Sequence, residues 1–205
     1  MLRFTLIALC FLLPFYAQAS ALEAPIIKQM QGLVVVVGQD GLQRAYTGMG
    51  LHAGDEVRTG RHGKVYIDFP DNSRVKLGIR SNFMIQDWAV EDNIFTSSLR
   101  MLKGAFRYTA GALKSGLTLR RTTFKTNTAV LGVRGTDFWG RVDSKKTFFL
   151  LIEGSVEISH PFEQPIVYDK AGYAIDIQAN SISNPQAMIQ EEITPLAAET
   201  DISNR

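Results

Sequence analysis

The sequence predicts an all-β protein, a single domain of short strands arranged as a roll or a β-solenoid-like sandwich. Two stretches, 64–69 and 74–79, alternate apolar with polar residues, as half-buried strands do. Groups of turn-forming residues recur about ten residues apart, which is typical of sandwiches, rolls and solenoids. The 205 residues suffice for one hydrophobic core but hardly for two. We therefore expect one β domain over residues 26–180.

The first residues, 1–19, have the organisation of a secretory signal peptide. An apolar run at 5–15 is followed by the small-x-small stretch 17–19, so cleavage before Ser20 is expected. A retained membrane anchor is the alternative, but Pro14 breaks the run, which is shorter than the about 20 apolar residues of a spanning helix. The protein is predicted to be periplasmic, with no transmembrane segment after cleavage.

The cysteine count and the distribution of charge limit the kinds of functional site that the protein can have. The single cysteine, Cys10, lies in the signal, so the exported chain would have no thiol catalysis, thiolate metal site or disulfide. The 22 basic and 20 acidic residues nearly balance, and net charge names no partner. Between Arg100 and Lys146, however, eleven basic residues oppose two acidic ones. The C-terminal segment 181–205 is predicted to be a polar, acidic tail in which a short helix is possible.

The first half of the chain predicts hairpins. A β-branched run at 33–37 stops at the glycine-bounded turn 38–41, and the following residues can pair back with it. Strands follow at 64–69 and 74–79, joined by the turn 70–73. Frequent glycines between these segments disfavour any helix there.

The secondary structure of the second half of the chain is less clearly indicated by the sequence. Residues 94–108 fit a strand, a turn at Gly104 and a second strand better than a helix. The basic, threonine-rich stretch 117–128 is compatible with a strand on a solvated surface. The strongest hydrophobic segment, 147–158, is predicted to be a pair of strands with a turn at Gly154.

The segment 128–139 between them is predicted to be a core strand. It carries apolar residues on both parities, as a strand covered on both faces does. Arg134 lies in its middle, and a guanidinium in a dry strand needs a carboxylate or several carbonyls around it. Arg134 is therefore predicted to be a buried structural tie. Its candidate partners are Glu153 and Glu157, with Asp137 and Asp55 left open.

The same segment carries a recognisable signature, Val-Leu-Gly-Val-Arg-Gly-Thr-Asp-Phe at 130–138. It is accompanied by Gly-Asp-Glu-Val-Arg-Thr-Gly at 54–60, by Phe-Pro-Asp-Asn-Ser at 69–73 and by later glycine-centred turns. In this order, over residues 31–172, the motifs closely resemble the FecR-type periplasmic domain, with Asn72 where glycine is usual. The residues that carry the resemblance are Gly54, Asp55, Asp71, Val133, Arg134, Gly135, Thr136, Glu153 and Gly154.

The resemblance implies a periplasmic module for signalling or ligand sensing. Full regulators of this type also have a cytoplasmic anti-sigma region and an internal transmembrane helix, and neither is recognisable in this sequence. We therefore expect an exported binding, scaffolding or sensing module. We expect the signature residues to have mainly structural roles. Glycine can adopt the positive φ that a reversal of the chain requires, and the Asp-Asn-Ser side chains at 71–73 can hydrogen-bond to the backbone of their turn.

No catalytic constellation is present, and we predict a non-catalytic protein without cofactor or metal. His52, His62 and His160 lack the short spacing of metal ligands. Asp68 falls on the solvated face of its strand, so no pair of tuned carboxylates is indicated. The enzyme alternative is a cell-wall hydrolase.

The basic segment is the better candidate for a contact. Arg120, Arg121 and Lys125 alternate with threonine and suit an anionic envelope polymer. The alternative is a solvated basic face that keeps edge strands from pairing. Nucleic acid is not expected as a partner of an exported protein. The predicted partners are therefore an envelope protein or an anionic envelope polymer.

Overall fold

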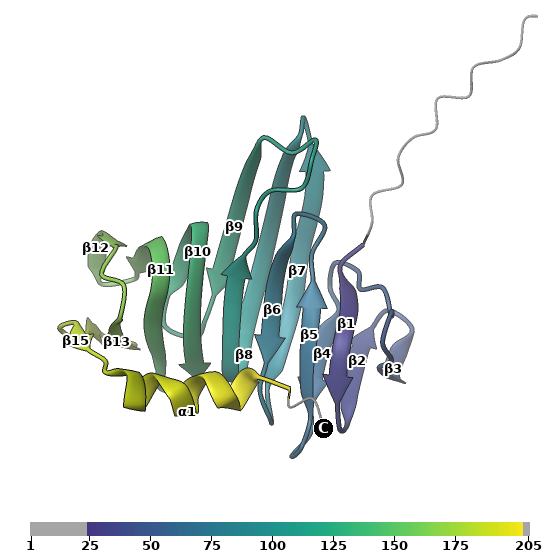
Figure 1. Cartoon of the computed structure of the whole chain (residues 1–205), viewed down its shortest axis with the longest axis horizontal. Helices are drawn as coiled ribbons and strands as arrows, with labels where there is room; N and C mark the ends of the chain where they lie inside the picture. The colour runs from purple at the N-terminus through teal and green to yellow at the C-terminus, as the bar shows by residue number, and fades with distance from the viewer. Residues whose placement is uncertain (1–23, 203–205) are drawn as a thin grey trace, which may run out of the picture.

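The computed structural model describes residues 24–202 as a β sandwich with one helix (Figure 1). The predicted signal peptide, residues 1–19, lies outside the described residues. The elements are β1 Ile26–Gln31, β2 Val34–Gly38, β3 Gly41–Arg44, β4 Glu56–Thr59, β5 Lys64–Asp68, β6 Ser73–Leu77, β7 Asn82–Glu91, β8 Ile94–Ala110, β9 Leu119–Lys125, β10 Val130–Val142, β11 Lys146–His160, β12 Glu163–Tyr168, β13 Tyr173–Gln178, β14 Ser181–Ile182, β15 Gln186–Ala187 and α1 Gln190–Thr200. The all-β prediction is confirmed.

All strands belong to one open sheet that folds over on itself into two layers. The back layer consists of β3, β2, β4, β7, the first part of β8, β9, the first part of β10, the second part of β11 and β12. The front layer, toward the viewer in Figure 1, consists of β1, β5, β6, the second parts of β8 and β10, the first part of β11 and β13 to β15. Neighbouring strands are antiparallel except β8 and β9, which are parallel.

The core lies between the two layers and is rich in aromatic rings. Phe106 of the front layer stacks on Phe124 of the back layer, with ring centroids 4.6 Å apart. Phe138 packs against Tyr108 at 5.4 Å and against Phe149 at 5.2 Å. All five side chains are fully buried. Each contributes roughly 2–3 kcal/mol by leaving water, so these rings hold the layers together.

Three long strands pass between the layers, and each turns at a glycine with positive φ. Gly104 turns β8 at φ +101°, Gly135 turns β10 at +59° and Gly154 turns β11 at +87°. The left-handed region costs other L-residues about 1–2 kcal/mol, so glycine is favoured at these bends. The stretches 94–108 and 147–158 are therefore parts of continuous strands. The prediction of two strands in each was wrong because a glycine bend redirects a strand without ending its ladder.

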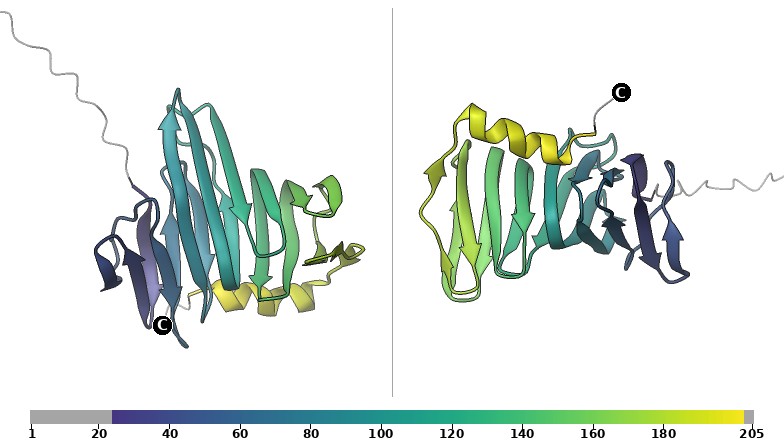
Figure 2. Two further views of the ribbon diagram at one scale, coloured as in Figure 1. Left: turned by 180° about the vertical axis from the view of Figure 1, so that it is seen from behind. Right: turned by 90° about the horizontal axis from the view of Figure 1, so that it is seen from below.

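The C-terminal segment packs against the sandwich. The helix α1 crosses the front layer near its lower end in Figure 1 and lies along that layer in the right view of Figure 2. The Lys64 ammonium donates to the carbonyl oxygens of Ala198 and Asp201, both at 2.7 Å. Residues 186–187 pair with β13 as β15, and the helix of the C-terminal segment begins after them, at Gln190. Within residues 24–202, α1 is the only helix, and it is too short and too polar for a membrane span.

Candidate functional site

The signature stretch forms a bulge between β10 and β11. Two residues of β10, Gly135 and Thr136, stand opposite one residue of β11, Gly154. The Thr136 hydroxyl donates to the carbonyl oxygen of Ser155 at 2.6 Å. A Cβ on Gly154 would lie only 2.7 Å from the carbonyl oxygen of Gly135, so the two backbones need glycine to approach. The signature therefore builds a bend at which Gly135 and Gly154 have positive φ.

The bulge also changes which parity of β10 faces the core. Before it, Leu131 and Val133 are buried, and after it Phe138 is buried, one residue out of phase. The extra residue of a bulge shifts the alternation in this way. Apolar residues on both parities thus partly reflect a change of phase at Gly135. Val130, at 39% exposure, shows that the outer face is not covered before the bulge, whereas Trp139, at 1% exposure, is covered after it.

Arg134 lies on the outer face of the back layer, so its prediction as a buried tie was wrong. Val133 before it points inward, and Arg134 takes the outward position of the alternation. Its side chain is exposed and forms no ion pair with any residue of 24–202. The four proposed partners were Glu153, Glu157, Asp137 and Asp55, and of these Asp137 binds Arg107 instead.

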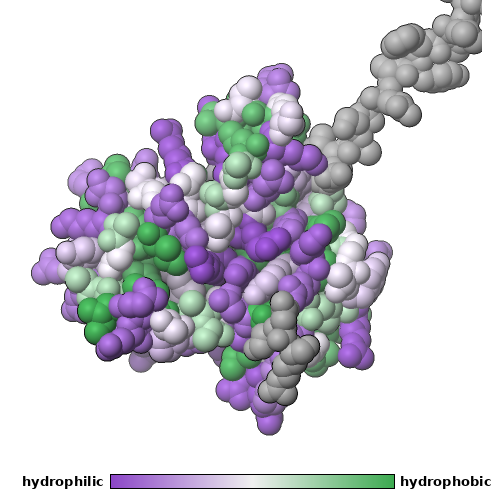
Figure 3. All heavy atoms as spheres, viewed as in Figure 1, coloured by the Kyte–Doolittle hydropathy of each residue, from purple (hydrophilic) through white to green (hydrophobic). Residues whose placement is uncertain are grey.

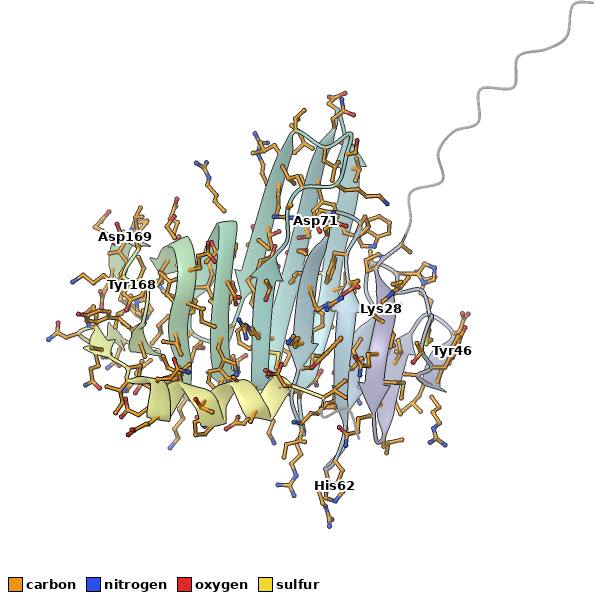
Figure 4. The ribbon with its side chains drawn as sticks, viewed as in Figure 1. Lys28, Tyr46, His62, Asp71, Tyr168 and Asp169 are labelled. Atoms are coloured by element: carbon orange, nitrogen blue, oxygen red, sulfur yellow. The ribbon has the colours of Figure 1, made fainter. Side chains whose placement is uncertain are left out.

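Arg120 is the arginine that the fold buries. Its Nε donates to Oδ2 of the fully buried Asp71, and its Nη2 donates to the carbonyl oxygens of Asp71 at 2.6 Å and Gly111 at 3.1 Å. The other carboxylate oxygen of Asp71 accepts from the N–H and the hydroxyl of Ser73. Figure 4 places Asp71 inside the molecule, in its upper part. The prediction that Arg120 contacts a polyanion was wrong, because Arg120 shares the inward parity of Phe124 and its donors are used internally.

The motif at 54–60 forms the turn that leads into β4. Gly54 has φ +91°, and its N–H donates to the carbonyl oxygen of Ile85 at 2.7 Å. Asp55 is 7% exposed, and its Oδ2 accepts the N–H of His52 at 2.8 Å. A side chain on Gly38 would collide with the same carboxylate, since its Cβ would lie 2.3 Å from Oδ1. This motif positions a strand and does not present a free carboxylate.

The positions of these motifs coincide with a known family. A model described as FecR protein matches residues 55–157, half of the chain. The chain belongs to the FecR protein family. The matched stretch begins at Asp55 and includes the buried Asp71 and the bends at Gly104, Gly135 and Gly154. The resemblance read from the sequence is confirmed.

Two solved structures share the FecR-family fold of this chain. Both are crystal structures of a protein described as a candidate anti-sigma factor from Parabacteroides distasonis ATCC 8503, at 1.65 Å and 2.50 Å resolution. Each matches with a TM-score of 0.52 and 14% sequence identity, over 68% of this chain and 62% of that protein. The chain thus spans less than two thirds of their length, and at this identity the likeness shows the fold alone. No curated protein sequence matched the chain.

The FecR signature residues do not meet in one pocket with reactive groups. His62 lies at the lower tip of the molecule, away from Asp71 (Figure 4). His160 is 6% exposed, and its Nε2 lies 2.8 Å from the carbonyl oxygen of Gln178. Over residues 24–202 no three histidine, cysteine, aspartate or glutamate side chains are grouped as metal ligands would be.

The basic segment is divided between the two outer faces of the sandwich. On the front face, cations pair with acids: Arg74 with Asp68, Lys76 with Asp201, Arg107 with Asp137 and Arg141 with Glu199. Hydrophilic side chains accordingly form a band across this face (Figure 3). The hydrogen bonds that Arg107 donates to the carboxylate of Asp137 raise the pKa of the Arg107 guanidinium. On the back face, the cations of the basic segment without an ion-pair partner in the described part of the chain are Arg100, Arg121, Lys125 and Arg134.

Sequence reasoning missed the ion pairs that join distant segments, and two of them lie within the stretch that matches the family. Arg120 and Asp71 are 49 positions apart, and Arg107 and Asp137 are 30 apart. One signal was available for the first pair, because Arg120 has the parity of Phe124 and so belongs to the apolar face of its strand. The second pair depends on the register between β8 and β10, which no local pattern specifies.

Proposed function

We propose that this FecR-family protein is an exported periplasmic module that binds an envelope component, as a sensor or scaffold, and catalyses no reaction. The observation that carries the proposal is that three polar side chains of the signature, those of Asp55, Asp71 and Thr136, are bonded within the fold. Asp71 is neutralised by Arg120, and the Thr136 hydroxyl donates to the backbone of β11. A general acid or base must instead reach a substrate with a tuned pKa. A family whose marked residues build bends is better suited to presenting a surface.

Export is inferred from residues 1–19 and can be tested separately. A reporter enzyme that is active only outside the cytoplasm is fused after Arg205. We expect activity from the whole chain and none when the apolar run 5–15 is replaced by serines. Equal reporter activity from both fusions would contradict export through this segment.

Binding to the envelope is tested by sedimentation. The purified protein is mixed with isolated envelopes and centrifuged, and we expect it to enter the pellet and to leave it at high salt. A protein that stays in the supernatant at low salt would contradict the proposal. Prior treatment of the envelopes with protease distinguishes the two candidate partners, because a polymer partner survives the treatment and a protein partner does not.

The proposal that the protein is not catalytic is tested with cell-wall material as the substrate. The protein is incubated with isolated cell wall, with a muramidase as positive control, and soluble reducing ends and muropeptides are measured. We expect no release above the buffer blank. Release that grows with protein concentration would establish the hydrolase that the sequence left as an alternative.

A further inference from the structure

We propose that the outer face of the back layer, over β8, β9, β10 and β11, binds an anionic polysaccharide. The left view of Figure 2 shows this layer toward the viewer. The inference rests on the proposed function for the compartment in which protein and polymer meet. It deepens that function by naming the ligand class and the residues that hold it.

Two pairs of like charges carry the inference. Arg100 of β8 stands directly opposite Lys125 of β9. Arg121 of β9 and Arg134 of β10 take the next positions beyond the last ladder pair of these strands, so they are also neighbours. Like charges opposite each other destabilise a sheet, and no acid among residues 24–202 forms an ion pair with any of the four. An anionic group between the partners of each pair removes this repulsion.

The outer face over β9, β10 and β11 is hollow and lined with hydroxyls. Gly132 of β10 has no side chain there, and it lies beside Thr123 of β9, which pairs with Ser98 of β8. Arg121 and Arg134 line the same hollow. At about 3.3 Å per residue, the four-residue step along β9 separates the two cation pairs by roughly 13 Å. The surface therefore offers two anion positions joined by a strip of hydrogen-bonding groups.

Acidic residues stand on the two sides of this strip, on the neighbouring strands. Glu157 of β11 is opposite Gly132, and Asp87 of β7 is opposite Ser98. Neither forms an ion pair with the four cations. They repel an anion at the sides and so favour a ligand that runs along the strip, from one cation pair to the other. Glu157 lines the hollow, which makes it a useful probe of the ligand's charge.

The chemistry of the lining favours a polysaccharide over other polyanions. A guanidinium binds carboxylate, sulfate or phosphate oxygens through two parallel N–H donors. Serine and threonine hydroxyls match sugar hydroxyls, and the exposed Leu119 and Val130 offer apolar surface to the C–H faces of sugar rings. No Phe, Tyr or Trp lines the hollow, so it lacks the stacking platforms of single-stranded nucleic acid sites and the aromatic anchors of protein interfaces.

Two separated cation pairs also predict a preference for polymers. Once one anionic group of a polymer is bound at the first cation pair, its other anionic groups are held at high effective concentration near the second pair. Dextran sulfate should therefore bind far more tightly than glucose sulfate at equal sulfate concentration. Neutral dextran should not bind, and polygalacturonate, which carries carboxylates, shows whether a sulfate is needed.

The test is calorimetric titration of the purified protein with dextran sulfate. We expect Arg121→Gln and Arg134→Gln each to weaken binding roughly 5- to 10-fold, as loss of a charge-assisted hydrogen bond does. Glu157→Gln should tighten binding. The matched control is Arg44→Gln, which removes an exposed arginine from β3 at the far end of the same layer and should leave affinity unchanged. Urea unfolding of each variant verifies that it folds.

Several outcomes would overturn the proposal. They are an absence of binding to any anionic polymer, a loss in Arg44→Gln equal to that in Arg121→Gln, and binding of neutral dextran. Tighter binding to vesicles of anionic lipid or to single-stranded DNA than to dextran sulfate would assign the face to another class of ligand. These measurements use purified protein, so a failure of export in cells leaves them unaffected.

Discussion

The two outer faces of the sandwich carry comparable cations but surround them differently. On the front face, Arg107 binds both oxygens of Asp137, at 2.9 and 2.7 Å, and Lys76 binds Asp201 of the C-terminal segment at 2.6 Å. On the back face, Arg121 and Arg134 are neighbours and form no ion pair with any acid within 24–202, although Glu157 lines the same hollow. The front cations therefore hold the protein together, whereas those of the back remain available to another molecule.

The strand β10 carries charged residues on both outer faces, and it shows how the fold separates paired from unpaired charges. Arg134 and Asp137 are three residues apart on β10, yet Arg134 is unpaired on the back face and Asp137 is paired on the front face. The bend at Gly135 lies between them. The family signature thus assigns the charges on either side of it to different faces, and the comparison can be tested by substitutions on each side.

The largest effect is expected where an arginine points inward. Arg120→Ala leaves the carboxylate of Asp71 buried without its partner, and we expect the free energy of unfolding to fall by about 3–5 kcal/mol. Arg121, the next residue, points outward without a partner, and Arg121→Ala should change stability by no more than about 0.5 kcal/mol. Urea unfolding of both variants measures the difference. Similar losses in the two variants would contradict the assignment of Arg120 as the tie.

The bends that divide the faces should show the next largest effect. Gly154→Ala meets both a positive φ and the carbonyl oxygen of Gly135 at 2.7 Å, and we expect a loss of about 2–4 kcal/mol. Gly135→Ala has open space around the new Cβ and should lose only the conformational part, about 1–2 kcal/mol. Gly135→Asn is the matched control, because asparagine tolerates this region better than alanine does. Thermal and urea unfolding rank the three, and equal losses at both glycines would show that the close approach is unimportant.

Much of the fold could be predicted from local signals. The hairpin around the turn 38–41 and the strands 64–69 and 74–79 follow from alternation and turn residues, and the structure confirms them. Gly135 also has the positive φ that favours glycine. These features depend on a few neighbouring residues, whose backbone preferences are written in the sequence itself.

The roles of the two key arginines could not be predicted in the same way. Arg134 looked buried because apolar residues flank it on both parities, but a bulge shifts the phase of the strand directly after it. Arg120 looked solvated because it lies in a basic stretch, but its partner Asp71 comes from a turn far back in the chain. Neither a shift of phase nor a contact of long sequence separation leaves a periodic pattern. The bulge and the register had to be known before the faces could be assigned.

Charge removal on the two faces should have unequal effects on stability. Asp137→Asn deprives the half-buried Arg107 of a bidentate partner, and we expect a loss of about 1–2 kcal/mol. Arg134→Gln removes one member of a like-charge pair and should be neutral within about 0.5 kcal/mol, or slightly stabilising. Urea unfolding at low and high salt tests this, since salt screens the repulsion on the back face. A loss in Arg134→Gln as large as in Asp137→Asn would mean that Arg134 has a partner within the protein.

The smallest effect concerns a pair on the back layer away from the hollow. Arg58 donates to both oxygens of Glu56 on β4, at 2.8 and 2.9 Å, and this hydrogen bonding lowers the pKa of Glu56 against the opposing effect of burial. A lowered pKa in the folded state means that the pair's contribution to stability is present above the ordinary glutamate pKa and is lost as the pH falls through the lowered value. We expect Glu56→Gln to be less stable than the unchanged protein near neutral pH and to converge with it in acid. Urea midpoints over about pH 3–7 measure the two curves. Arg134 has no such partner to protonate, so the difference in stability between Arg134→Gln and the unchanged protein should stay constant over the same pH range. A stability difference for Glu56→Gln that is also constant would contradict the distinction between paired and unpaired cations on this layer.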